Sequence, residues 1–213
     1  MKTALKTETR ANNHFYDGWA YQRFIDPALA SIRKRVAAII PEGSTVLDVG
    51  GGTGNQVLFM AEKIKSAICI ELSETMVNTA RRQADRRGID NCDFQLADAT
   101  DLSHLADKSF DYSISSMVIH EMPEAKRLPV LKEMKRLGNQ IILVDWIYPQ
   151  TSTPKLISTH IVEFMAGWQH YAGFRSFMQG GGMPALLQEV GLEVIETQIT
   201  NKGTIQLWVC HPA

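Results

Sequence analysis

Short apolar runs alternate with longer amphipathic segments through the middle of the chain. Several of these runs are apolar on both faces, which is typical of strands in a parallel sheet that helices cover on both sides. The predicted strands are 45–49, 67–71, 92–96, 110–115 and 140–146. Helical periodicity elsewhere predicts helices over 27–39, 55–65, 74–87 and 123–137. This alternation of strands and helices predicts a doubly wound α/β sheet.

The end of the chain has a different pattern. Two strand-like runs, 192–200 and 204–211, are separated by a short turn around Asn201 and Gly203. Two such runs with a turn between them pair antiparallel as a hairpin. The predicted fold is therefore a Rossmann-like, doubly wound α/β sheet of seven strands, mostly parallel, with an antiparallel C-terminal hairpin.

The composition is that of a folded protein with little net charge. The 213 residues are 45% hydrophobic, and 22 Lys and Arg against 23 Asp and Glu give a formal charge of −1. Such a chain lacks the positive field that drives binding to a phosphate backbone, and it has no apolar run long enough to span a bilayer. We therefore expect no nucleic-acid partner and no membrane insertion. Cys69, Cys92 and Cys210 lie far apart, which favours reduced thiols and a cytoplasmic location.

A glycine-rich loop lies between the first predicted strand and the helix after it. Its four glycines follow Asp48 closely, at positions Gly50, Gly51, Gly52 and Gly54. Glycines let the backbone turn sharply and approach a ligand, and the N–H groups at the helix start favour an anion. Glu71 ends the second predicted strand, where a carboxylate can accept hydrogen bonds from ribose hydroxyls.

The spacing of these glycines differs from that of dinucleotide-binding loops. The dinucleotide fingerprint requires a third glycine at position 55, where this chain has Asn55. The loop therefore disfavours a nicotinamide cofactor. An ordinary tight turn is the structural alternative, and four glycines within five positions argue against it.

Taken in order, the motifs resemble those of class I S-adenosylmethionine-dependent methyltransferases of the small-molecule type, similar to the ubiquinone and menaquinone methyltransferases. The loop 48–54 resembles the family's D-x-G-x-G-x-G motif, and 71–76 resembles its acidic ribose motif followed by S-x-x-M. The segments 97–102 and 110–121 are similar to the next loop and to the fourth strand with its His-containing exit. Ala97 stands where glycine is commoner in the family.

The resemblance implies S-adenosylmethionine as the cofactor and S-adenosylhomocysteine as its product. By this resemblance the glycine loop wraps the methionine part, Glu71 binds the ribose, and Asp98 reads the adenine; a turn or N-cap role is the alternative for Asp98. Because a buried, unpaired carboxylate is costly, we expect Asp48 to be satisfied by loop N–H groups or by the cofactor's ammonium group. The residues expected at the cofactor are Asp48, Gly50, Gly51, Gly52, Gly54, Asn55, Glu71, Leu72, Met76, Asp98, Ala99 and Ser115.

His120 and Glu121 follow the fourth predicted strand, where the resemblance places the transferred methyl group. Methyl transfer requires an acceptor lone pair aligned with the methyl group and, for some acceptors, removal of a proton. An imidazole suits that task, so His120 is the candidate catalytic residue. Capping the next helix or packing beside the cofactor is the structural alternative for this side chain.

The segment 147–182 is rich in aromatic residues and histidines, which suit the wall of a small-molecule site. The alternative is an amphipathic helix that closes the sheet or a subunit interface, as in a homodimer. His160 and Glu163 share one helical face, but a single such pair is poor evidence for a metal, and no metal site is predicted. The candidate acceptor residues are Tyr16, Tyr21, Glu121, His160, His170 and Tyr171.

We therefore predict an enzyme that moves a methyl group to a nitrogen, oxygen or carbon atom of a small-molecule acceptor. The alternative is a non-catalytic cofactor-binding or partner protein on the same fold. The expected organisation is a single domain, with a helical cap at 1–43, a cofactor-binding core at 44–146, an acceptor-site insertion at 147–182, and the last helix and hairpin at 183–213.

Overall fold

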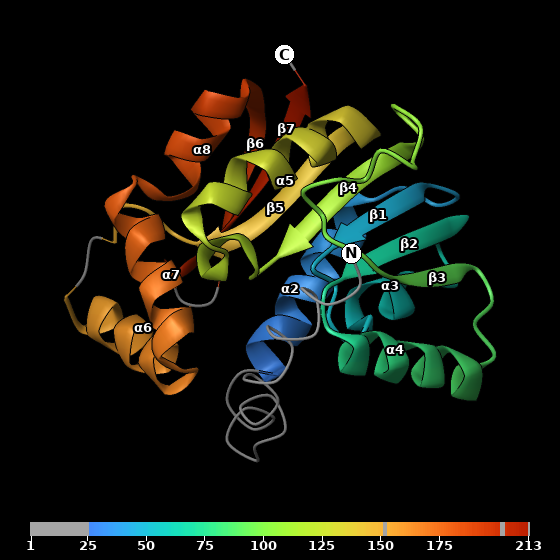
Figure 1. Cartoon of the computed structure of the whole chain (residues 1–213), viewed down its shortest axis with the longest axis horizontal. Coiled ribbons are helices and arrows are strands. Elements are labelled where there is room, and N and C mark those ends of the chain that lie inside the picture. The colour runs from blue at the N-terminus through green and yellow to red at the C-terminus, as the bar shows by residue number, and fades with distance from the viewer. Residues whose placement is uncertain (1–25, 151–152, 201–202, 213) are drawn as a thin grey trace, which may run out of the picture.

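A seven-stranded sheet runs through the molecule in the order β3-β2-β1-β4-β5-β7-β6 (Figure 1). The computed structural model describes residues 26–150, 153–200 and 203–212. The strands are β1 (Thr45–Val49), β2 (Ser66–Glu71), β3 (Cys92–Leu96), β4 (Phe110–Ser116), β5 (Gly138–Trp146), β6 (Leu192–Thr200) and β7 (Ile205–Pro212). The first five pair in parallel, and β7 pairs antiparallel with both β5 and β6. The predicted fold class is confirmed.

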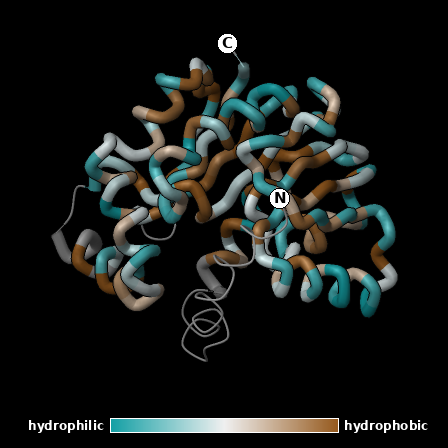
Figure 2. Tube along the Cα trace, viewed as in Figure 1, coloured by the Kyte–Doolittle hydropathy of each residue, from teal (hydrophilic) through white to brown (hydrophobic). Residues whose placement is uncertain are grey.

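Helices cover both faces of the sheet. Neighbouring residues of β1, such as Val46 and Leu47, therefore point into opposite hydrophobic cores. Figure 2 shows hydrophobic positions gathered along the central strands, whereas α4 is largely hydrophilic on its outer side. The helices of the first face are α2 (Asp26–Ile39), α3 (Asn55–Met60) and α4 (Glu74–Arg87), and those of the second face are α5 (Glu124–Leu137) and α8 (Gly182–Val190).

The helix α4 has the bounds that its sequence predicts, because both of its ends carry local signals. Ser73 is the N-cap, and its hydroxyl accepts the N–H of Met76 at 3.4 Å. Gly88 ends the helix in the left-handed region, with φ of 64°. Its buried face is formed by Val77 and Ala84 with Ala80 between them, which packs α4 against the sheet.

The predicted helix over 55–65 is wrong in its second half, because α3 ends at Met60. Beyond it the chain turns back toward the start of β1. The carbonyl oxygen of Lys63 accepts the N–H of Gly43 at 2.9 Å, and the N–H of Lys65 donates to the carbonyl oxygen of Ser44 at 2.9 Å. These tertiary hydrogen bonds end the helix. No local sequence pattern predicts them.

Three elements lie beyond the carboxyl ends of β4 and β5: η1 (Ile119–Glu121), α6 (Thr153–Met165) and α7 (Trp168–Gln179). The helix α7 packs closely on η1 at Gly173, where a Cβ atom would lie 2.6 Å from the carbonyl oxygen of Glu121. Arg127 of α5 is buried and donates to the carbonyl oxygens of Gly173 and Met122, at 2.7 and 3.1 Å. Within the described ranges, no helix has the length and apolar character needed to cross a membrane.

Candidate active site

The glycine loop lies at the carboxyl end of β1, where the strand order reverses between β1 and β4. Open α/β sheets bind their ligands at this position. Gly50, Gly52 and Gly54 have φ of 71°, 57° and 74°, in the region that favours glycine. A Cβ atom at Gly50 would lie 2.5 Å from the Val118 side chain, and one at Gly54 would collide with Phe94. The loop therefore requires glycine both for its conformation and for its close packing.

Gly51 lies against the Asp48 carboxylate. A Cβ atom at Gly51 would lie 2.8 Å from Asp48 Oδ2 and would collide with Cys69 Sγ. Asp48 is 2% exposed, and among the described residues its Oδ2 has no hydrogen-bond partner. Burial, together with the charge of Glu71, raises the pKa of Asp48 to about 7. The loop N–H groups do not satisfy this oxygen, so the cofactor's ammonium group is the remaining partner that we expected for it.

Glu71 holds the loop from the end of β2. Its Oε2 accepts the N–H of Gly52 at 3.1 Å, and its Oε1 accepts the N–H of Ser73 at 2.9 Å. Burial raises the pKa of Glu71 above its ordinary value, although these N–H groups oppose the shift. Leu72 follows with an apolar side chain that is 47% exposed. A carboxylate beside exposed apolar surface suits the ribose and the flat adenine of S-adenosylmethionine, so the residues present fit this cofactor.

Asp98 organises the loop after β3. Its Oδ1 accepts the backbone N–H and the hydroxyl of Thr100, at 3.0 and 2.8 Å. Its Oδ2 lies 3.0 Å from Nζ of Lys126, a residue of α5 that the sequence analysis missed. Burial raises the pKa of Asp98, but the hydrogen bonds from Thr100 and Lys126 outweigh it and hold the pKa below its ordinary value. Asp98 thus has the turn role given as its alternative, and its contact with adenine stays a prediction.

Other predicted cofactor residues lie near the loop with their polar groups engaged inside the protein. The Ser115 hydroxyl is 1% exposed and donates to the carbonyl oxygen of Val49 at 2.9 Å. The Asn55 amide donates to the Thr53 hydroxyl at 3.1 Å. Ala99 is buried. These contacts position the loops, and direct contact of these side chains with the cofactor stays a prediction.

A buried histidine lies where β4 and β5 end. His120 is 2% exposed; its Nδ1 lies 2.7 Å from Asp145 Oδ1, and its backbone N–H donates to Asp145 Oδ2 at 3.2 Å. Its Nε2 lies 3.5 Å from Oε1 of Glu163 on α6. Burial lowers the pKa of His120, but Asp145 and Glu163 raise it well above its ordinary value. Asp145 and Glu163 occupy both ring nitrogens of this buried imidazole, so the base role of His120 stays a prediction.

His170 of α7 connects Glu121 to the same buried carboxylate. Its Nδ1 lies 2.9 Å from Glu121 Oε2, and its Nε2 lies 2.9 Å from Glu163 Oε2, close but not aligned as a hydrogen bond. The indole N–H of Trp146 donates to Glu163 Oε1 at 2.7 Å. Burial lowers the pKa of His170, but its carboxylate partners raise it to about 9. Burial raises the pKa of Glu163, but the two histidines lower it to about 2.

The predicted acceptor residues fall into three groups in the structure. Glu121 and His170 are in contact, and His160 Nδ1 lies 3.1 Å from the hydroxyl oxygen of Tyr171. Tyr16 and Tyr21 lie outside the described residues. Glu163 faces His120 and His170, although its helical spacing had paired it with His160.

Asp145 was missed in the sequence analysis, although a signal for it exists. It is a charged residue near the end of an otherwise apolar strand, β5, and the structure buries it completely. A buried carboxylate requires hydrogen-bond partners or an opposite charge. A charged residue at the carboxyl end of a predicted parallel strand was therefore reason enough to include Asp145 among the candidates.

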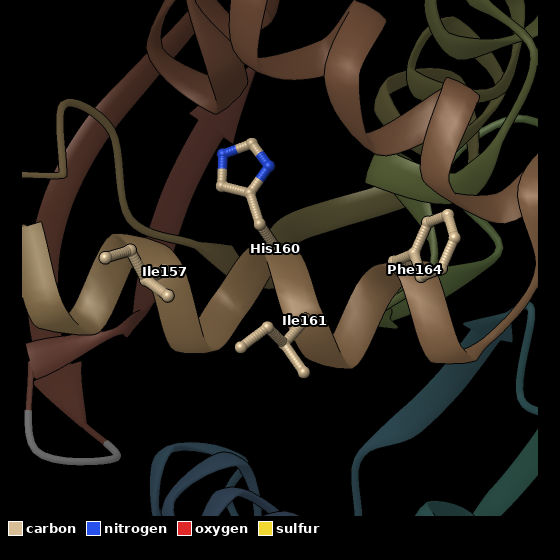
Figure 3. Close-up of a pocket in the computed structure, with 4 residues that line it drawn as sticks. All are labelled: Ile157, His160, Ile161 and Phe164. Atoms are coloured by element: carbon tan, nitrogen blue, oxygen red, sulfur yellow. The ribbon is translucent and has the colours of Figure 1, made fainter.

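An apolar hollow of about 330 Å³ lies along α6 and is lined by Ile157, His160, Ile161 and Phe164 (Figure 3). The three apolar side chains are each more than half exposed. In Figure 3 His160 and Ile161 extend to opposite sides of the helix. The His160 ring lies 5.1 Å from Phe174, which in turn lies 6.4 Å from His120. The hollow is thus one aromatic ring away from the buried histidine.

Comparison with known proteins identifies the family. A family described as "Methyltransferase domain" matches residues 46–140. Methyltransferase GfsG of Streptomyces halstedii is 31% identical over 206 residues, which cover 91% of this chain and 70% of GfsG. The ubiquinone/menaquinone biosynthesis C-methyltransferase UbiE of Rickettsia typhi is 34% identical over 101 residues, which cover 44% of this chain and 40% of UbiE.

A solved structure has the same fold. The magnesium protoporphyrin IX methyltransferase ChlM from Synechocystis PCC 6803, with bound SAH, is 19% identical to this chain. The two superpose with a TM-score of 0.65, covering 89% of this chain and 85% of ChlM. The glycine loop, the carboxylates beside it and the match to GfsG over most of both chains lead to one conclusion. The chain belongs to the class I S-adenosylmethionine-dependent methyltransferases.

Proposed function

We propose that this protein transfers the methyl group of S-adenosylmethionine to an oxygen, nitrogen or carbon atom of a small molecule. The observation that carries the proposal is the glycine loop held by Glu71 at the strand-order reversal, beside an Asp48 oxygen that no described residue pairs with. The cofactor, when bound, supplies an activated methyl group on a sulfonium sulfur. The protein's part is to align the acceptor atom with that group, exclude water and receive any proton that the acceptor releases.

The residues that would hold the cofactor lie at the carboxyl ends of the first three strands. The glycine loop would surround the methionine part, and Asp48 would pair with its ammonium group. Glu71 would accept the ribose hydroxyls in exchange for one of its loop N–H donors. Leu72 and the turn at Asp98 would enclose the adenine. Each role is tested by cofactor affinity alone, with no acceptor present.

We place the acceptor beside Glu121 and His170, the more exposed members of the cluster that also contains His120, Asp145 and Glu163. Their side chains are 27% and 18% exposed, whereas Asp145 is fully buried. Glu121 also lies close to the cofactor loop: after burial and the N–H groups of Ser73 and Gly52, its charge is the next influence on the pKa of Glu71. An acceptor bound here would have polar partners on one side and the cofactor on the other.

A small acceptor suits the open hollow that the described residues form along α6. The hollow along α6 has about 330 Å³, at the lower end of the volumes of small-ligand sites. Its walls are apolar apart from His160, which suits a ligand with a hydrophobic body and few polar groups. We therefore place the hydrophobic part of the acceptor against α6 and its reacting group toward His170.

The first test is calorimetric titration of the full chain with S-adenosylmethionine and S-adenosylhomocysteine. Replacement of Glu71 by Ala removes the ribose acceptor and should weaken binding by about 1–3 kcal/mol. Glu74→Ala, on the exposed first turn of α4, is the matched control and should bind normally. No affinity of the native chain for either compound would overturn the proposal.

The second test separates an enzyme from a non-catalytic cofactor-binding protein on the same fold. Mass spectrometry of ligands carried through purification identifies candidate acceptors, and release of S-adenosylhomocysteine measures transfer to them. A panel of phenols, amines and enolisable carbonyl compounds covers the three acceptor atoms. Retained cofactor binding with no transfer across this panel would favour the binding protein.

A homodimer is part of the same proposal, with the junction between α6 and α7 as the contact. Met165 and Trp168, at the junction of these helices, are 59% and 69% exposed. Large apolar side chains this exposed suit contact with a second copy. Light scattering of the purified chain decides the point, and Trp168→Glu should lower the measured mass if this contact forms the dimer.

A further inference from the structure

Five ionisable side chains meet at the ends of β4 and β5, and their arrangement is more regular than a chance ion-pair network. Each of the two imidazoles is held at Nδ1 by its own carboxylate: Asp145 lies 2.7 Å from His120, and Glu121 lies 2.9 Å from His170. Both imidazoles then direct Nε2 toward one further carboxylate, Glu163, at 3.5 and 2.9 Å. The two Nε2 atoms and the Glu163 oxygens thus converge from three different elements, η1, α7 and α6.

This is the arrangement found around protein metal ions. A histidine that binds a metal through one ring nitrogen usually donates the other ring N–H to a carboxylate, which fixes its orientation. Nitrogen and oxygen ligands lie about 2.0–2.2 Å from Zn²⁺, so neighbouring ligand atoms of a tetrahedral site are about 3.4 Å apart. His120 Nε2 lies 3.5 Å from Glu163 Oε1, close to this value, and His170 Nε2 lies at a shorter 2.9 Å from the other oxygen, Oε2. Ligating atoms of His120, Glu121 and His170 also all lie within 4.8 Å of one another, a group that contains Glu121 in place of Glu163.

The burial and the charge of these side chains also favour a bound cation. His120 and Asp145 are almost completely buried, and Glu163 is 3% exposed. The cluster brings three carboxylates together, and two of them, Asp145 and Glu163, are buried in a space lined by aromatic rings. Trp146, Phe174 and Phe177 all pack at 6.1–6.4 Å from the His120 ring. Buried carboxylates require compensating positive charge, which protonated imidazoles supply when no metal is bound; a divalent cation would supply two charges to the same carboxylates with both imidazoles neutral.

The Glu163 carboxylate is itself oriented for a further partner. Its Oε1 accepts the indole N–H of Trp146 at 2.7 Å, which fixes the plane of the group. Its Oε2 is buried and, within the described part of the chain, has no aligned hydrogen bond. A buried carboxylate oxygen without an aligned donor, close to an imidazole nitrogen, is the position that a metal ion would complete.

We propose that His120, His170 and Glu163 bind one divalent transition-metal ion, with Asp145 and Glu121 orienting the two imidazoles. Two imidazoles and one carboxylate suit Zn²⁺ or Fe²⁺ and leave at least one coordination position open. His170 is the more exposed of the two histidines, so the open position faces the acceptor side. The further role of this ion, to hold an acceptor oxygen and lower its pKa, rests on the proposed methyl transfer; the binding of the ion does not.

Metal binding is tested on the full chain after removal of bound ions with a chelator and dialysis. Titration with Co²⁺ reports coordination through its visible absorption, and elemental analysis after dialysis against Zn²⁺ gives the stoichiometry. We expect one ion per chain and the absorption intensity of a four- or five-coordinate Co²⁺. A folded native chain that retains no stoichiometric Co²⁺ or Zn²⁺ would overturn the proposal.

Three variants separate ligands from orienting residues and from surface binding. Glu163→Gln removes a ligand and should lose at least 100-fold in affinity for Co²⁺, while Glu121→Gln should lose about 10–100-fold, as other outer-shell partners do. His104→Asn removes an exposed histidine on the loop between β3 and β4, outside the cluster, and should bind as the native chain does. The ligand assignment would be overturned if folded Glu163→Gln bound Co²⁺ as tightly as the native chain does. It would fail equally if Glu121→Gln lost affinity for Co²⁺ while Glu163→Gln did not.

The same samples distinguish this proposal from the methyl transfer. Circular dichroism and affinity for S-adenosylhomocysteine are measured on each variant, so an unfolded protein is not mistaken for a lost ligand. If Glu163→Gln does not fold, the partly exposed Glu121 carries the test through its Co²⁺ spectrum. A chain that binds the cofactor but no metal refutes the metal site alone, and a chain that binds metal but no cofactor refutes the proposed function alone.

Discussion

Asp145 contacts His120 through both of its carboxylate oxygens. Oδ1 lies 2.7 Å from the imidazole Nδ1, and Oδ2 accepts the backbone N–H of the same residue at 3.2 Å. Oδ1 also accepts the backbone N–H of Trp146 at 2.7 Å. One carboxylate at the end of β5 therefore fixes the position of η1, the orientation of the imidazole and the exit of its own strand.

Replacement of Asp145 by Asn should lower both stability and activity. An amide has one accepting oxygen, so at least one of the three N–H donors would face its NH2 group in a buried site. We expect the free energy of unfolding to fall by about 3 kcal/mol, the lower range for breaking a buried charged pair. Urea denaturation measures this loss, and turnover should fall with it because His120 loses its orientation.

Asp111→Asn is the matched control for Asp145→Asn. Asp111 lies on the neighbouring strand β4 and accepts two hydrogen bonds from Thr45 at 2.8 Å, but it is exposed. Water can replace those bonds, so its loss should change stability by less than about 1 kcal/mol. Equal losses in the two variants would show that the geometry around His120 carries no special stability.

The Gly51 position should tolerate no side chain. In Gly51→Ala the new Cβ atom would collide with Cys69 Sγ and approach Asp48 Oδ2, both of which are buried. The loop must therefore shift outward, and affinity for S-adenosylhomocysteine should fall by about tenfold or more, equal to about 1.4 kcal/mol. Calorimetry measures this affinity.

Gly88→Ala is the control, because only the backbone conformation favours glycine at that position. Gly88 caps α4 with φ of 64°, and a Cβ atom there would meet no described residue within 4 Å. It should cost about 1 kcal/mol of stability through its left-handed backbone, with cofactor affinity unchanged. If Gly51→Ala binds the cofactor as well as Gly88→Ala does, the loop does not approach the ligand as we place it.

The buried Asp48 carboxylate should make stability depend on pH. Burial raises its pKa from 3.8 to about 7, so the folded state holds a proton that the unfolded state releases. The stability that protonated Asp48 contributes to the folded state is fully present below about pH 4, and it is lost as the pH rises through 7. Asp48→Asn removes this charge, and it should stabilise the cofactor-free protein at pH 8 by up to about 4 kcal/mol, and by less at pH 5.5.

The same variant should bind S-adenosylhomocysteine more weakly, because the amide cannot pair with the ligand's ammonium group as a carboxylate does. Chemical denaturation at the two pH values and calorimetry at pH 8 measure the two effects. The exposed Asp93→Asn serves as the control for a change of one surface charge. A stability difference between native chain and Asp48→Asn that is the same at both pH values would contradict the shifted pKa.

The sheet and the cofactor loop could be predicted because their signals are local. The glycines, their strand and the acidic residue at the end of β2 follow one another within about 25 positions, and α4 carries its own caps at Ser73 and Gly88. The end of α3 at Met60 could not be predicted, since hydrogen bonds to Gly43 and Ser44 decide it.

The cluster around His120 could not be assembled from the sequence for a related reason. His120 and Glu163 are 43 positions apart, and only the packing of α6 and α7 over η1 brings them together. Helical spacing paired Glu163 with His160 because both lie on α6, but the crossing of the helices turns it toward His170. Residue types suggested a polar site, and tertiary packing determined its members.

The contact between α7 and η1 should therefore be sensitive to a single methyl group. In Gly173→Ala the new Cβ atom would lie 2.6 Å from the carbonyl oxygen of Glu121, so α7 must move away from η1. That movement stretches the 2.9 Å contact between His170 and Glu121 and the hydrogen bond from Arg127 to the Gly173 carbonyl oxygen. Overpacking of this kind costs about 1–3 kcal/mol.

We expect turnover of Gly173→Ala to fall by about tenfold or more, the rate equivalent of about 1.4 kcal/mol, while cofactor affinity stays within about twofold. Hydrogen exchange along α7 should become faster, because the helix loses its close packing on η1. Gly180→Ala is the milder control: the nearest atom to its Cβ is the carbonyl oxygen of Ser176 at 3.3 Å, and it lies at the exposed end of the same helix. Native turnover in Gly173→Ala would mean that the acceptor does not use the surface formed by His170 and Glu121.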